Sequence, residues 1–202
     1  MIFINRYFHP DLSATSEMLS GLAFALSELG LSVTIITSRL RYEGGKALYS
    51  PSEIIRGVQI HRVWTSQFGR FLLLGRSLDY LSFFFAAGWR LWRLARAGDV
   101  VVAKTDPPLL SVMAAAVAKL KSARLVNWLQ DIFPEVAEAL NFGGGPARAA
   151  FRLMRPLRNW SLRAADINVV VGEGMAERLR GLGIDGQNIR IIQNWSDGSL
   201  VL

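Results

Sequence analysis

The sequence contains no cysteine and only two histidines, His9 and His61. Without cysteine the chain cannot form a disulfide, supply a thiol nucleophile or build a zinc site from cysteine and histidine ligands. Residues 1–6 also lack the basic start and long apolar run of a secretory signal peptide. These absences exclude disulfide, thiol and zinc chemistry, and we expect a protein that is not exported and stays in the cytoplasm.

Long uncharged apolar runs are lacking as well. Residues 71–94 form the most apolar stretch, but Arg76, Asp79 and Arg90 interrupt it, whereas a bilayer-spanning helix needs about 20 apolar residues. Two interpretations remain: a helix packed against a sheet, or an interfacial helix that presses aromatic rings into lipid headgroups with arginines beside them. In the second case, the membrane contacts of this stretch are Phe84, Trp89, Arg90, Trp92 and Arg93.

Four well-known motifs are absent. The chain has no G-x-G-x-x-G for a dinucleotide and no G-x-x-x-x-G-K-[ST] for a P-loop. It has no G-x-S-x-G for a hydrolase nucleophile and no D-x-D pair for a metal-bridged nucleotide. We therefore expect a site without metal and without a bound cofactor.

Positive charge is in excess, and most of it comes from arginine. Lysine and arginine together number 23 against 16 acidic residues, and only four of the 23 are lysine. The segment 139–165 has no acidic residue, and five arginines recur there at helical spacing: Arg148, Arg152, Arg155, Arg158 and Arg163. This face either meets an anionic surface, with Arg148, Arg152 and Arg155 as membrane contacts, or is an ordinary solvated helix face.

Short apolar runs alternate with helical patterns along the chain. The run 2–4, the helical spacing of Met18, Leu22 and Leu26, and the run 33–37 form a βαβ unit, whose strands are parallel. Residues 39–53 have the composition of a loop. The pattern predicts an α/β fold: a Rossmann-like, doubly wound, mostly parallel sheet with helices on both faces. Its roughly seven strands are 2–4, 33–37, 58–64, 99–103, 124–129, 167–171 and 189–192.

Ligands of open parallel sheets bind outside the carboxyl ends of the strands. The loops that leave those ends contain most of the polar side chains suited to catalysis, so we expect them to lie along one edge of the sheet. The candidates are His9, Asp11, Lys104, Asp106, Asp131 and Glu135.

Most of these candidates also have a simpler interpretation. Asp131 could orient a hydroxyl group or bond the backbone of its own loop. Glu135 suits a helix N-terminus, and Asp106, which precedes two prolines, suits an N-cap. His9 and Asp11 flank a proline turn. Lys104 is expected to pair with a phosphate or a carboxylate.

An ordered series of segments resembles the retaining, GT-B-fold glycosyltransferases of family 4. The series begins with Tyr-Phe-His-Pro-Asp at 7–11 and continues with a Thr-Asp-Pro-Pro run, an Asp-Ile-Phe-Pro-Glu run and Ile-Ile-Gln-Asn-Trp-Ser-Asp at 191–197. Together these segments extend over essentially the whole chain. The resemblance is strongest to exopolysaccharide enzymes of the colanic-acid fucosyltransferase type.

The resemblance implies the N-terminal, acceptor-binding half of such an enzyme. Residues 1–197 would form this domain and 198–202 would begin the interdomain linker, while the donor-binding half is absent from the sequence. The implied activity is transfer of a sugar from a nucleotide sugar to a lipid-linked saccharide at an anionic membrane, peripheral to its inner face. Asp131 would then act in catalysis, and His9, Asp11, Lys104, Asp106 and Glu135 would bind the acceptor. The chain alone would be inactive, and donor-binding residues are not identified.

The alternative is a protein without enzymatic activity. The same basic surface suits a membrane-associated subunit of a split glycosyltransferase or a basic binding module. A nucleic-acid partner is not expected, because the chain lacks a recognition-helix motif and an alternation of aromatic and basic residues.

Overall fold

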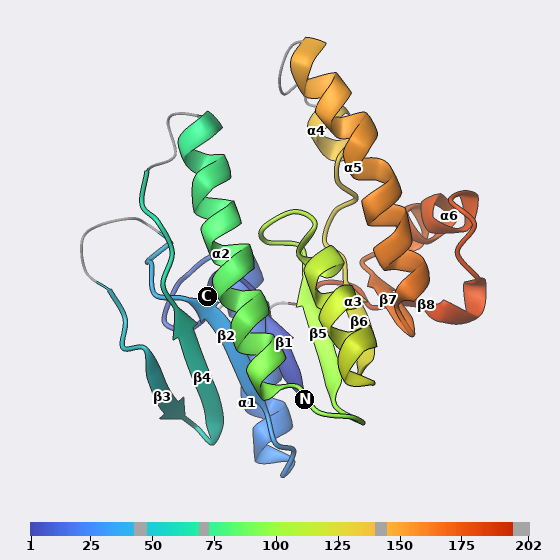
Figure 1. Cartoon of the computed structure of the whole chain (residues 1–202). Helices are drawn as coiled ribbons and strands as arrows, with labels where there is room; N and C mark the ends of the chain where they lie inside the picture. Colours follow the sequence, from blue (N-terminus) through green and yellow to red (C-terminus); the bar gives the residue numbers. More distant parts are fainter. Residues whose placement is uncertain (43–47, 69–72, 140–144, 196–202) are drawn as a thin grey trace, which may run out of the picture.

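The computed structural model describes residues 1–42, 48–68, 73–139 and 145–195. A single eight-stranded sheet runs through the molecule in the order β3-β4-β2-β1-β5-β6-β7-β8 (Figure 1). Every neighbouring pair is parallel except β3 and β4 at the edge. The strands are β1 Ile2–Ile4, β2 Thr34–Ser38, β3 Ser52–Ile55, β4 Val58–Val63, β5 Val100–Lys104, β6 Arg124–Trp128, β7 Ile167–Val170 and β8 Ile189–Ile191.

Helices cover both faces of this sheet, as the sequence predicts. Figure 1 shows α2, α3 and α5 on one face and α1 behind the sheet on the other. The helices are α1 Ala14–Glu28, α2 Leu73–Leu94, α3 Leu110–Lys121, α4 Glu135–Ala139, α5 Gly145–Ala164 and α6 Glu173–Gly181, and a 3₁₀ helix, η1, spans Gly186–Asn188.

The alternation of side chains along each central strand divides the core into two main layers. In β1, Ile2 and Ile4 pack with the buried side chains of α2 and α3. Phe3, between them, points to the opposite face and packs with Leu19 and Phe24 of α1. Both faces of β1 are thus buried, which explains why its sequence is continuously apolar rather than alternating.

The structure differs from the prediction at one edge of the sheet, where β3 adds an eighth strand. Residues 39–53 were expected to form a loop, but Ser52–Ile55 pairs antiparallel with β4. Arg56 and Gly57 join the two strands with φ angles of 48° and 80°, which is the backbone of a tight two-residue hairpin. The strand is half exposed, so it lacks the apolar run that identifies the buried strands.

The loops that leave the parallel strands meet at one edge, as predicted. The backbone N–H of Arg6, after β1, donates to the carbonyl of Asp106, after β5 (2.9 Å). The Lys104 ammonium, at the end of β5, donates to the carbonyl of Thr15 at the start of α1 (3.1 Å). The β1 and β5 loops are therefore joined directly, and β6 ends beside Lys104 in register.

Within the described part of the chain, no helix combines the length and apolarity required to cross a membrane.

Candidate functional site

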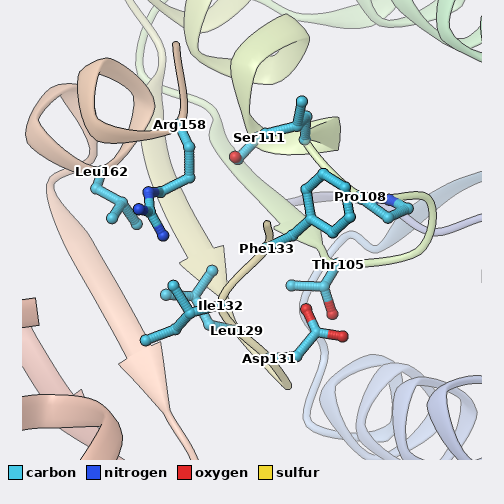
Figure 2. A pocket seen from close by; sticks show the side chains of 10 residues that line it. Thr105, Pro108, Ser111, Leu129, Asp131, Ile132, Phe133, Arg158 and Leu162 are labelled. Atoms are coloured by element: carbon cyan, nitrogen blue, oxygen red, sulfur yellow. The ribbon is translucent and has the colours of Figure 1, made fainter. Parts of the chain in front are cut away.

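A small pocket opens at this carboxyl edge, between the ends of β5 and β6 and the side of α5 (Figure 2). Its wall is mainly apolar, and three kinds of polar group project into it: hydroxyls, a carboxylate and a guanidinium. The lining residues are Thr105, Pro108, Leu109, Ser111, Leu129, Asp131, Ile132, Phe133, Arg158 and Leu162. A mostly apolar wall with a few polar groups is typical of small-ligand sites.

Asp131 is the pocket's carboxylate, and it lies three residues beyond the end of β6. Its Oδ1 atom is buried, and no described residue donates a hydrogen bond to it. Burial raises the pKa of Asp131 above its ordinary value. A partly desolvated carboxylate without a donor can accept a hydrogen bond from a ligand hydroxyl that enters the pocket.

Glu135 does not extend into the pocket as a free carboxylate, because Arg158 already binds it. Two guanidinium nitrogens of Arg158 donate to the two Glu135 oxygens at 2.7 and 3.0 Å. Burial alone would raise the pKa of Glu135, but the hydrogen bonds and charge of Arg158 outweigh it and lower that pKa. Arg158 lines the pocket, whereas Glu135 serves as its bidentate partner and is therefore a structural counter-charge rather than a free carboxylate.

Asp11 is likewise occupied by residues of its own chain. Its Oδ1 accepts from the Tyr42 backbone N–H at 2.9 Å and from the Tyr49 hydroxyl at 3.1 Å. Burial raises the pKa of Asp11, although these hydrogen bonds and Arg62 oppose the rise. The carboxylate thus ties the β1 exit loop to the segment that follows β2.

His9, beside Asp11, packs its ring edge-on against Phe24 with 5.5 Å between ring centroids. Its carbonyl accepts from Arg62 at 2.8 Å. Both contacts are with residues of the chain itself, and the role of His9 in acceptor binding stays a prediction.

Lys104 is buried at the centre of the edge, with 1% of its surface exposed. Its ammonium lies 3.8 Å from the ring centroid of Trp128, which in turn stacks on Trp195. Burial lowers the pKa of Lys104 to about 7, although Asp106 opposes the shift. The expected pairing with a carboxylate does not appear among its hydrogen bonds in the described chain, where the acceptor is the Thr15 carbonyl.

Asp106 is not the N-cap that the sequence suggests. Helix α3 begins at Leu110, and the cap position is Leu109, which has a φ of 66° and no side-chain cap bond. Asp106 and Pro107 each precede a proline, and such residues are disfavoured in the helical conformation. The helix therefore starts only after Pro108.

The exposed face of α2 agrees with the prediction at Trp89, Trp92 and Arg93 but differs at Phe84. Phe84 packs on the core, whereas Phe85 is 77% exposed. Trp89 and Trp92 are exposed at 63% and 38%. Arg93 is exposed beside the Trp89 ring, while Arg90 is only half exposed. Phe84 is thus partly buried against the core, and Phe85 is the more exposed neighbour in the triple phenylalanine run; a membrane contact through Phe84 stays a prediction.

The arginines of α5 do not form one free face. Arg152 is exposed, but Arg155 pairs with Glu138 and Arg158 is buried against Glu135. The side chain of Arg148 lies outside the described residues. Arg155 is therefore partly neutralised as a membrane contact.

Sequence reasoning did not identify Thr105 and Arg158 as pocket residues. Thr105 lies in a predicted exit loop but carries no charge that singled it out. The Glu135–Arg158 pair spans 23 residues, and no spacing rule links an exit loop to a helix at that separation.

The family model for the glycosyl transferase 4-like domain matches residues 14–195. The chain belongs to this family. A probable glycosyltransferase of Pseudomonas aeruginosa, WbjE, is 29% identical over 124 residues, which cover 61% of this chain and 31% of WbjE.

The fold of this family member is also similar to solved structures. The crystal structure of Anabaena HepE in complex with UDP-glucose matches 97% of this chain and 44% of HepE, with a TM-score of 0.55 and 12% identity. The HepE complex with UDP matches with a TM-score of 0.51. At this identity the likeness concerns the fold alone: an α/β domain of the GT-B type. The chain spans less than half the length of WbjE and of HepE.

Proposed function

We propose that this chain is the acceptor-binding half of a retaining glycosyltransferase that transfers a sugar from a nucleotide sugar to a lipid-linked saccharide. The family match and the name of the Pseudomonas relative support sugar transfer. The UDP-glucose complex of HepE supports a nucleotide sugar as the donor. We further propose a role in exopolysaccharide or lipopolysaccharide synthesis, as the sequence resemblance suggests, with the donor bound outside the described residues.

The observation that carries the acceptor assignment is Asp131. No described residue donates to its buried Oδ1, and both Asp131 and Thr105 line the open pocket (Figure 2). A sugar offers the hydroxyl groups that would satisfy this oxygen, and Phe133 and Pro108 offer apolar surface to its ring.

Asp131 has a direct chemical task in this proposal. Sugar transfer forms a bond between an acceptor hydroxyl oxygen and the anomeric carbon, breaks the bond to the nucleoside diphosphate and releases the hydroxyl proton. A carboxylate that accepts a hydrogen bond from that hydroxyl orients it and increases its negative charge. We assign this task to Asp131.

A lipid-linked acceptor requires a membrane surface, and α2 has suitable side chains. Its exposed row lies at helical spacing and is bordered by cations, with the Lys121 ammonium 4.2 Å from the Trp92 ring. The row consists of Leu78, Leu81, Phe85, Trp89 and Trp92. We propose that this row contacts the headgroup region and that the protein binds the membrane peripherally.

Binding measurements on the chain test the proposal. We expect a short-chain prenyl-diphosphate-linked monosaccharide to bind in calorimetric titrations and UDP-glucose to bind weakly or not at all. Tight UDP-glucose binding without acceptor binding would contradict the assignment of this half.

A vesicle assay tests the membrane proposal separately. We expect vesicles rich in anionic lipid to pellet the protein at low salt, and Phe85→Ser with Trp89→Ser to reduce pelleting. Phe84 is not a suitable control because it packs against the core, so Leu120→Ser, at an exposed position of α3, is the matched variant. Equal pelleting by neutral and anionic vesicles would remove the charge-dependent part of the proposal.

If the chain binds neither acceptor nor donor but still binds vesicles, the non-catalytic membrane subunit becomes the better description.

A further inference from the structure

Three arginines of the described chain are buried, and they differ in what neutralises them. Arg62 pairs with Glu53, and Arg158 pairs with Glu135. Arg6 is 7% exposed, yet it forms no ion pair with a described residue, and its buried Nε donates to none of them. A buried charge is costly unless a counter-charge or hydrogen bonds compensate it.

Aromatic rings supply part of this compensation. The Arg6 guanidinium carbon lies 4.9 Å from the Tyr80 ring centroid and 5.4 Å from that of Tyr7. Cation–π contacts of this kind stabilise the charge, but they do not supply hydrogen-bond acceptors for the N–H donors of the guanidinium. The buried Nε of Arg6 is one such donor.

A second guanidinium meets the same ring. The Arg76 carbon lies 5.4 Å from the Tyr80 centroid, and its Nε donates to the Tyr80 hydroxyl at 2.8 Å. Arg76 also forms no ion pair with a described residue. The single acid of α2, Asp79, accepts from Ser66 and Phe68 through its Oδ1. Two like charges therefore converge on one ring, and neither of them forms an ion pair with a described carboxylate, an arrangement that attracts an anion.

The position of Arg6 relates this charge to the pocket. Arg6 leaves β1 at the carboxyl edge, and its N–H bonds the carbonyl of Asp106. Thr105, the preceding residue of that loop, lines the Asp131 pocket. On the other side, Tyr80 is followed in α2 by Leu81, the second member of the exposed apolar row. The backbone of Arg6 thus lies beside the loop that supplies Thr105 to the proposed sugar pocket, and the ring that both arginines contact precedes a member of the proposed lipid-facing row.

We propose that Arg6 and Arg76, arranged around Tyr80, bind the diphosphate group of a prenyl-linked acceptor. Guanidinium groups match phosphate oxygens with paired N–H donors, and a diphosphate supplies the counter-charge that the described chain does not. The assignment to a lipid-linked acceptor rests on the proposed function, whereas the existence of an anion site does not.

Calorimetric titration with inorganic pyrophosphate tests the anion site directly. We expect one site per chain, with the affinity falling about tenfold or more in Arg6→Gln and by a smaller factor in Arg76→Gln. Arg56→Gln is the matched control, because Arg56 also lies over an aromatic ring but pairs with Glu28. Absence of pyrophosphate binding, or an equal loss in Arg56→Gln, would overturn the inference.

Melting temperatures show whether a loss of pyrophosphate affinity in Arg6→Gln comes from misfolding of the variant. Arg6→Gln removes a charge that no described residue pairs, so we expect a melting temperature equal to or above that of the wild type. Pyrophosphate should raise the melting temperature of the wild type and not that of the variant. A large fall in the unliganded variant would show that Arg6 serves stability and would overturn the proposal.

Two further ligands distinguish the source of the diphosphate. Farnesyl diphosphate should bind more tightly than pyrophosphate, because its chain can lie on the apolar row of α2. UDP binding more tightly than both would assign the site to the donor instead and refute the acceptor part. If the wild-type chain binds pyrophosphate through Arg6 but does not bind the sugar acceptor, the proposed function is refuted and the anion site remains.

Discussion

Asp11 and Asp131 lie in exit loops at the same edge of the sheet, and burial raises the pKa of both. Their surroundings nevertheless differ. Asp11 accepts hydrogen bonds from Tyr42 and Tyr49, whereas the buried oxygen of Asp131 has no donor among the described residues. Residue type and loop position are therefore insufficient to identify a functional carboxylate. The decisive difference is whether the fold already satisfies its oxygen atoms.

Glu135 is the extreme case of an occupied carboxylate, and removing its partner should have the largest effect on stability. Arg158→Met leaves Glu135, whose side chain is 18% exposed, without its counter-charge. We expect the free energy of unfolding to fall by about 3 kcal/mol, measured by chemical denaturation.

The more exposed Arg155–Glu138 pair provides the control for this variant. Arg155→Met should cost less than about 1 kcal/mol. The double change Arg158→Met with Glu135→Leu should restore most of the loss. Similar losses in Arg155→Met and Arg158→Met would contradict the interpretation of Glu135 as a structural residue.

Lys104, the last residue of β5, tests how far water is excluded from the carboxyl edge of the sheet. Its pKa is about 7 in the folded chain against an ordinary 10.5. Between these values the unfolded chain binds a proton that the folded chain does not, so stability should increase as the pH rises from about 7 to 10. The gain should be on the order of 3 kcal/mol.

Denaturation curves across this pH range measure the effect, and Lys104→Met should remove the increase. Lys119→Met, on the exposed surface of α3, is the control and should leave the increase intact. A wild-type stability that is flat or falls over this range would show that the Lys104 ammonium is well solvated.

Alanine substitution of the two aspartates should change the free energy of unfolding by different amounts, and this difference is smaller than the effects above. Asp11→Ala leaves the Tyr42 N–H and the Tyr49 hydroxyl without an acceptor and should cost about 1–2 kcal/mol. Asp131→Ala removes a carboxylate whose buried Oδ1 accepts from no described residue, so stability should stay unchanged or increase. Thermal unfolding of both variants measures the difference. Tyr49→Phe removes one of the two hydrogen bonds to Asp11, so it should cost part of the stability that Asp11→Ala costs. A larger loss in Asp131→Ala would reverse the comparison.

The sequence predicts the parallel part of the fold because short apolar runs alternate with helical patterns along the chain. β1 and the first four residues of β5 are continuously apolar, and parallel strands with helical connections bring their exit loops to one edge. β3 escaped prediction because an edge strand can be short and half exposed. The start of α3 was misplaced because two consecutive prolines delay the helix.

The site was only partly predictable for a different reason. Asp131 follows directly from its position after β6, but its unsatisfied oxygen depends on which donors surround it in three dimensions. The occupation of Asp11 by Tyr49 and the burial of Arg158 against Glu135 join segments far apart in the chain. Arg6 is adjacent to a predicted strand, yet only its missing partner singles it out.

Acceptor affinity in paired aspartate variants tests the central claim most directly. Titration of a prenyl-diphosphate-linked monosaccharide into wild type, Asp131→Asn and Asp11→Asn compares an open carboxylate with an occupied one. We predict that Asp131→Asn weakens binding about tenfold or more, while Asp11→Asn, whose amide oxygen can still accept from Tyr42 and Tyr49, stays close to wild type. Unchanged affinity in Asp131→Asn, or an equal loss in Asp11→Asn, would contradict the assignment of the Asp131 pocket as the acceptor site.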